Sequence, residues 1–179
     1  MNMKTSSLRK VLAATIFGIG LGSVPTVAAP LPTQHYLTYE IALEAAQAAI
    51  ATCRAAGNHI SVSVMNSSGM ELVLIHDQLG SIHGAYSAHA KAYTVLSYSY
   101  SSHETTTSQI TNRITKSPAA VARIAGIPGL LLAAGGVLIK FGDETVGAIG
   151  VGGSSGGIKV GDEECAQAGI DKIKDRLHP

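Results

Sequence analysis

The stretch 127–153 constrains the fold more than any other part of the chain. Its apolar runs are interrupted by glycine pairs and by an acidic turn, which is typical of consecutive β-strands. The pattern predicts an antiparallel meander with strands at 130–133, 137–141 and 146–151. Because glycine weakens a strand, the glycines of the third strand indicate that backbone or a ligand lies close to this sheet.

Two more strands are predicted before the meander. Apolar and polar residues alternate over 59–65, and after the turn 66–69 a second run covers 70–76. Four helices are expected. The first starts at a Thr38 cap and ends near Gly57, and the second covers 81–96. The third covers 108–115 after a Thr107 cap, and the fourth starts at an Asp162 cap near the C-terminus. A short turn follows Pro118. These elements predict a single α/β (α+β) domain, and 97–107 is expected to be a polar loop.

The first 28 residues have the pattern of a secretory signal peptide. Basic residues precede the apolar run 11–21, and small residues surround a cleavage position after Ala28. An uncleaved N-terminal anchor is the alternative. We therefore expect a periplasmic or extracellular protein with a signal peptide over 1–28, a linker over 29–36 and a domain over 37–179.

The charge of the mature chain argues against binding to nucleic acid. The signal peptide contains three of the 13 basic residues and none of the 12 acidic ones, so its removal leaves a slightly acidic domain. Nucleic-acid binding depends on an excess of basic residues. We also expect no transmembrane span in the mature chain, because its apolar runs are too short.

Two cysteines, Cys53 and Cys165, lie on predicted helices near the two ends of the domain. An oxidising compartment permits a disulfide between them. Two separate buried thiols fit the sequence equally well. Neither cysteine has the C-x-x-C spacing or the neighbouring histidine of a metal site.

The helix predicted over 81–96 concentrates residues that can bind ligands. His83 and His89 are roughly 120° apart around this helix, so they cannot chelate one ion together. Lys91 shares a face with His83 and Thr94, and a cation beside hydroxyls can hold carboxylates. A solvated helix face is the alternative interpretation.

The glycine-rich run 153–157 matches the G-x-S-x-G pattern of a hydrolase nucleophile elbow. Such an elbow needs an acid and then a histidine further along the chain, and the remaining segment offers His178 beside the C-terminus. We therefore expect a flexible loop over 154–157 and assign no catalytic residue.

Four segments together carry a family resemblance: HAKAYT at 89–94, IPGLLLAAGG at 127–136, GAIGVGG at 147–153 and DEECAQAG at 162–169. In this order and spacing they resemble the GlcG/HbpS-like family of haem-binding proteins over residues 37–173. The resemblance implies a profilin-like fold of α/β/α layers around a five-stranded antiparallel sheet. It also implies a homo-oligomer, often an octamer.

The resemblance further implies that haem or a related tetrapyrrole is the ligand, used in haem sensing, storage or uptake. Two alternatives stay open: an enzyme that degrades haem oxidatively, and a cofactor-free accessory protein of a membrane sensor or transporter. We expect binding without catalysis, between the helix that carries His89 and the turn at Gly135 and Gly136, either within one subunit or across a subunit contact. The candidate cofactor contacts are His83, His89, Lys91, Thr94, Arg113, Gly135 and Gly136, with His89 as the candidate iron ligand. His103 and a missing proline before Thr107 depart from the family pattern, which leaves the axial ligand open.

Overall fold

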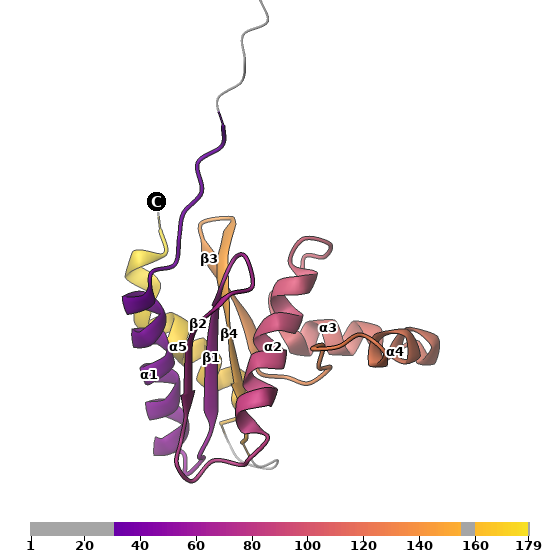
Figure 1. The fold of residues 1–179 in the computed structure, drawn as a ribbon, viewed down its shortest axis with the longest axis horizontal. Helices are drawn as coiled ribbons and strands as arrows, with labels where there is room; N and C mark the ends of the chain where they lie inside the picture. The colour runs from indigo at the N-terminus through magenta and orange to yellow at the C-terminus, as the bar shows by residue number, and fades with distance from the viewer. Residues whose placement is uncertain (1–30, 155–159, 179) are drawn as a thin grey trace, which may run out of the picture. The chain divides into compact units, whose positions relative to one another are not determined.

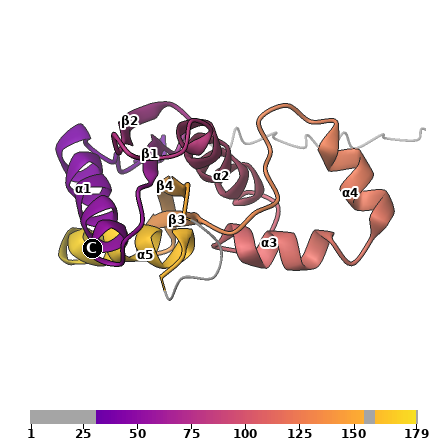
Figure 2. The same cartoon turned by 90° about the horizontal axis from the view of Figure 1, so that it is seen from below.

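A four-stranded antiparallel sheet, in the order β2-β1-β4-β3, lies between two layers of helices (Figures 1 and 2). One layer contains α1 and α5, and the other contains α2, from which α3 and α4 extend beyond the edge of the sheet. The strands are β1 (Ser61–Asn66), β2 (Glu71–His76), β3 (Gly136–Phe141) and β4 (Glu144–Gly152). The helices are α1 (Tyr39–Ala55), α2 (Gly84–Tyr98), α3 (Thr107–Ile114), α4 (Pro118–Ala125) and α5 (Asp162–Ile173), followed by a short 3-10 helix at Lys174–Arg176.

The computed structural model describes residues 31–154 and 160–178. All of these helices and strands belong to the unit Gln34–Pro179. The predicted signal peptide over 1–28 and most of the predicted loop 154–157 lie outside the described residues. In the described part of the chain, no helix combines the length and the apolar character needed to cross a bilayer.

The prediction of a five-stranded sheet is wrong, because 130–133 does not form a strand in the described chain. The free edge of β3 is used by residues just before α3 instead. Thr106 forms an isolated bridge with Val137, and the Leu138 amide donates to the Thr105 carbonyl over 2.9 Å. The segment 130–133 runs as irregular backbone toward α2, where the Leu131 amide donates to Thr94 Oγ1 over 2.8 Å.

Two of the predicted strand pairs are confirmed as hairpins, whereas the pairing of 130–133 with 137–141 is not present. β1 pairs with β2, and β3 pairs with β4 across the turn at Gly142 and Asp143. β1 and β4 also pair with each other in the centre of the sheet. Local alternation and turn residues therefore predicted these strands correctly.

Helix starts follow local capping, with two corrections. The Thr38 cap of α1 is confirmed, since its hydroxyl accepts from the Ile41 amide. α3 is capped by Thr106 rather than Thr107, in a capping box with Gln109. α5 is capped by Gly161 rather than Asp162, whose carboxylate has other partners that are described below. The turn expected after Pro118 is a full helix, α4, capped by Ser117.

The glycines of β4 allow the backbone of α2 to lie directly on the sheet. A Cβ at Gly150 would overlap the Ala88 carbonyl oxygen and lie 2.5 Å from the Ala92 nitrogen. At Gly152 a Cβ would lie 2.7 Å from the Ala88 nitrogen. The close neighbour predicted from these glycines is therefore helix backbone, not a ligand.

Cys53 and Cys165 form a disulfide that joins α1 to α5. Both residues are fully buried in the core between the sheet and the layer formed by α1 and α5. Of the two alternatives that the sequence left open, the structure shows the disulfide.

The turn after β2 is held by Asp77, whose side chain is only 2% exposed. Its carboxylate accepts a hydrogen bond from the Leu79 amide at 3.1 Å and two from Arg54, at 3.1 Å from Nε and 2.8 Å from Nη2. The Leu79 amide and the Arg54 guanidinium lower the pKa of Asp77 from 3.8 to about 2.

We expect Asp77 to stabilise the fold only while it is ionised. Because its pKa is lower in the folded state, this contribution is complete above pH 3.8 and is lost as the pH falls toward 2. Urea unfolding of wild type and Asp77→Asn should differ clearly at neutral pH and converge near pH 2. A difference in unfolding free energy that does not change with pH would contradict this role.

Candidate functional site

Helix α2 has two chemically different sides. One side buries Lys91 and Thr94, whereas another side exposes Tyr86, His89 and Tyr93 at least in part. Positions 89 and 91 are about 200° apart around a helix. A single pocket on α2 therefore cannot contain both His89 and Lys91.

Lys91 makes a buried ion pair with the start of α5. Its Nζ lies 2.5 Å from Asp162 Oδ2, and Asp162 Oδ1 accepts from the Ser154 amide over 3.0 Å. The predicted proximity of Lys91 to Gly135 is present, since a Cβ on Gly135 would lie 2.9 Å from Lys91 Cδ. The contact is direct, however, and the Lys91 cation is already neutralised by Asp162.

Thr94 and the paired glycines also have protein partners. The Thr94 hydroxyl donates to the Ala90 carbonyl over 2.7 Å and accepts from Leu131. The Gly136 amide donates to Thr107 Oγ1 over 2.9 Å. These contacts fix the segment before β3 against α2 and α3, so the structure brings Thr94, Lys91, Gly135 and Gly136 together.

His83 and Arg113 lie apart from this group. His83 is the exposed N-cap residue of α2 and makes no capping hydrogen bond with its side chain. Arg113 donates to both carboxylate oxygens of Glu104, at 2.6 and 2.8 Å, and lies over the Tyr98 ring. Arg113 therefore belongs to a cluster at the C-terminal end of α2.

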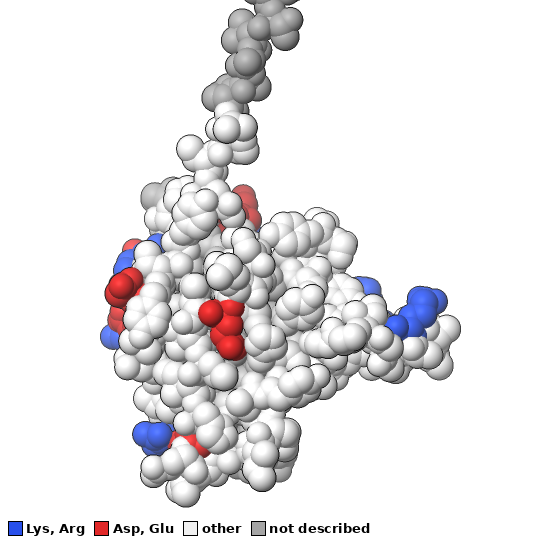
Figure 3. All heavy atoms as spheres, in the orientation of Figure 1, with Lys and Arg blue, Asp and Glu red and all other residues white. Residues whose placement is uncertain are grey.

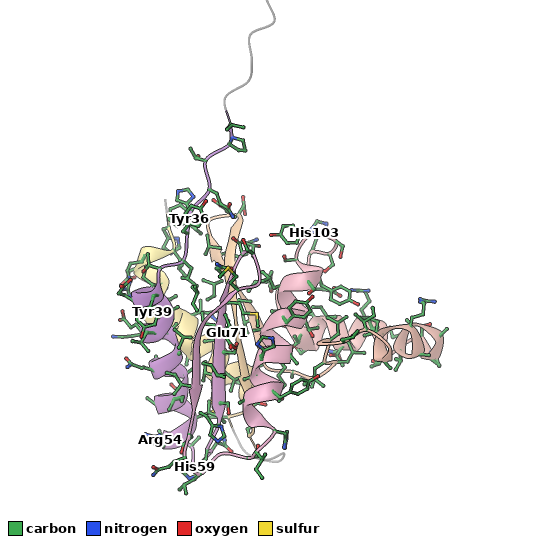
Figure 4. The ribbon with its side chains drawn as sticks, viewed as in Figure 1. Tyr36, Tyr39, Arg54, His59, Glu71 and His103 are labelled. Atoms are coloured by element: carbon green, nitrogen blue, oxygen red, sulfur yellow. A yellow bond between two sulfur atoms is a disulfide. The ribbon has the colours of Figure 1, made fainter. Side chains whose placement is uncertain are left out.

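His89 is held by a carboxylate from the edge strand β2. Its Nδ1 lies 3.0 Å from Glu71 Oε1, and the same oxygen accepts from the Ser63 hydroxyl over 2.6 Å. Figure 4 shows Glu71 on the side of the sheet that α2 covers. A proton on Nδ1, donated to Glu71, leaves the lone pair on Nε2, which is the arrangement that metal-binding histidines generally have.

The surface around His89 carries little charge. Figure 3 shows one acidic group at the centre of a broad face over β2 and α2, at the position that Figure 4 labels Glu71. Exposed apolar and aromatic side chains of this region are Leu74, Tyr86 and Tyr93. Such a surface suits a flat apolar ligand rather than a hydrated ion.

Glu71 was not among the residues predicted from the sequence. The signal for it was weak, consisting of one acid at the start of an otherwise apolar strand. Its pairing with His89 depends on how α2 crosses β2, which residue spacing does not reveal.

The described residues contain no group of three or more histidine, cysteine or acidic side chains placed to hold a metal ion.

A family model for haem-degrading HbpS-like proteins matches residues 37–171. The chain belongs to the HbpS-like family. This result confirms the resemblance seen in the four sequence segments. No curated protein sequence matches the chain at a significant level.

Solved structures agree with membership of the HbpS-like family. A crystal structure of HbpS has 33% sequence identity and a TM-score of 0.67, and the match covers 81% of this chain and 97% of that one. A double mutant of HbpS from Streptomyces reticuli has 30% identity and a TM-score of 0.67, covering 83% and 96%. A complex of PduOC with heme has 17% identity and a TM-score of 0.66, covering 77% and 95%, and therefore shows a shared fold alone.

Proposed function

We propose that this HbpS-like protein binds haem or a related tetrapyrrole on the exposed side of α2, with His89 as the iron ligand. The observation that carries the proposal is the chain of contacts from Ser63 through Glu71 to His89 on an otherwise uncharged face. Glu71 holds the imidazole ring in one orientation, which leaves Nε2 for the iron. Bound haem would supply an iron centre for oxygen or redox chemistry.

The other residues predicted to contact haem differ in exposure and in their contacts with the protein. His83 is exposed near the start of the same helix and stays a candidate for the haem carboxylates. Lys91, Thr94, Gly135 and Gly136 act through their contacts with the protein, as described above. Any direct contact of these residues or of Arg113 with haem stays a prediction.

Hemin titration of the purified mature protein tests the proposal. We expect a saturable shift of the Soret band, an affinity lowered at least tenfold by His89→Ala, and an affinity lowered roughly tenfold by Glu71→Gln. The matched control is His103→Ala, which removes an exposed histidine from the loop after α2 and should leave the affinity unchanged. Unchanged hemin affinity in His89→Ala would move the iron ligand to another residue.

A second candidate function is the oxidative degradation of haem, which the description of the matching family favours. The protein would then hold haem at the same face while a reductant and oxygen supply the electrons and the oxidant. Loss of the Soret band under these conditions, faster than for free hemin and slower in His89→Ala, would indicate degradation. A stable Soret band would indicate binding alone.

We further propose a periplasmic or extracellular location. The N-terminal pattern of a signal peptide and the disulfide between Cys53 and Cys165 support it, because disulfides persist in oxidising compartments. The homo-oligomer and the membrane sensor or transporter partner implied by the resemblance stay predictions.

A further inference from the structure

A cavity of about 580 Å³ opens at the end of the sheet where α1 and β2 finish. Figure 4 shows Arg54 and His59 together at this end, away from Glu71. The cavity is therefore separate from the proposed haem site on α2. The lining residues that matter here are Ile50, Arg54, His59, Ile75, Gln78 and Leu79.

Arg54 brings a positive charge to this cavity, whose other polar lining residues include His59, His76 and Gln78. Asp77 also lines it, but its carboxylate is almost fully buried and is already occupied by Leu79 and Arg54. Arg54 uses Nε and Nη2 for Asp77, and its side chain is 59% exposed. Since a guanidinium has five N–H groups, Arg54 keeps donors for a ligand while Asp77 holds it in place.

His59 adds a second nitrogen-bearing group. Its Nδ1 is buried 3.2 Å from Asp77 Oδ1, whereas the side chain as a whole is 39% exposed. Ile50, Ile75 and Leu79 contribute apolar surface, and the Leu79 side chain is exposed. A few polar groups among apolar walls, in a space of this size, are typical of sites for small organic molecules.

A metal ion is a poor fit to the same cavity, because the described residues contain no suitable cluster of ligands. A carboxylate matches the guanidinium of Arg54 in geometry and charge. We propose that this cavity binds a small organic carboxylate with an apolar body, independently of haem.

The test uses the haem-free mature protein and benzoate as the probe, followed by NMR chemical-shift titration. We expect saturable shifts at Arg54, His59 and Gln78 with millimolar benzoate, and none with benzyl alcohol, which lacks the charge. Arg54→Gln should weaken binding about tenfold or more, because a charge-assisted hydrogen bond is lost. Arg54→Lys should retain part of the affinity.

Two further variants keep the test decisive. Leu79→Glu places a negative charge at the cavity and leaves the Leu79 amide contact to Asp77 available, so it should abolish benzoate binding in a folded protein. Arg176→Gln removes an exposed arginine that also contacts a carboxylate, that of Glu44, and should have no effect. Absence of shifts in wild type, equal shifts with benzyl alcohol, or unchanged affinity in folded Leu79→Glu would overturn the proposal. None of these results depends on whether haem binds at His89.

Discussion

Replacing both cysteines, in Cys53→Ala/Cys165→Ala, should lower the free energy of unfolding by about 4–5 kcal/mol. The disulfide joins residues separated by 112 positions, so it restricts the unfolded chain strongly. It also joins α1 to α5, the two helices that together cover one face of the sheet (Figure 2). Urea unfolding of the oxidised wild type and the variant measures the difference.

Reduction provides the matched control for this experiment. Dithiothreitol should lower the stability of wild type to nearly that of the double variant and should leave the variant unchanged. A loss below about 1 kcal/mol would contradict the chain-entropy argument, since it would mean that native strain offsets most of the restriction.

Lys91→Met should destabilise the protein by about 3–5 kcal/mol, because it leaves the Asp162 carboxylate buried without its cation. The side chains of Lys91 and Asp162 are only 6% and 11% exposed. The second change in Lys91→Met/Asp162→Asn removes the unpaired charge and keeps the acceptor for the Ser154 amide. The double variant should therefore recover part of the loss, as measured by urea unfolding.

The exposed pair of Lys172 and Glu44 is the control for the buried one. Lys172 Nζ lies 3.7 Å from Glu44 Oε1, and the Lys172 side chain is 58% exposed. Lys172→Met should therefore change the free energy of unfolding by less than about 1 kcal/mol. Equal effects of Lys91→Met and Lys172→Met would show that burial of the ion pair does not matter. Hemin titration of folded Lys91→Met also tests the predicted contact between Lys91 and haem.

Elements with strong local signals could be predicted from the sequence. The alternation in β1, the turn at Gly142 and the Thr38 cap each depend on residues that are close along the chain. The segment 130–133 has the same apolar character but does not pair, because Thr105 and Thr106 occupy the edge of β3. Competition between two segments for one sheet edge is not visible in local periodicity.

In the candidate site, too, local spacing predicted some features and only tertiary contacts decided the others. Helical spacing placed Lys91 on the same face as Thr94, but the predicted pocket still combined Lys91 with His89, and spacing did not reveal which side of α2 faces the sheet. Lys91 is buried because Asp162, 71 positions further on, supplies its counter-charge. His89 stays accessible, and its carboxylate partner comes from β2.

The sequence by itself determined the family, the two hairpins and most of the helices, because motifs, turns and caps act over a few residues. Only the tertiary structure decided that β4 receives the backbone of α2 and that the two cysteines join. It also decided that Glu71 orients His89. Each of these contacts connects segments far apart in the chain, and each requires the sheet register and the helix packing to be in place first.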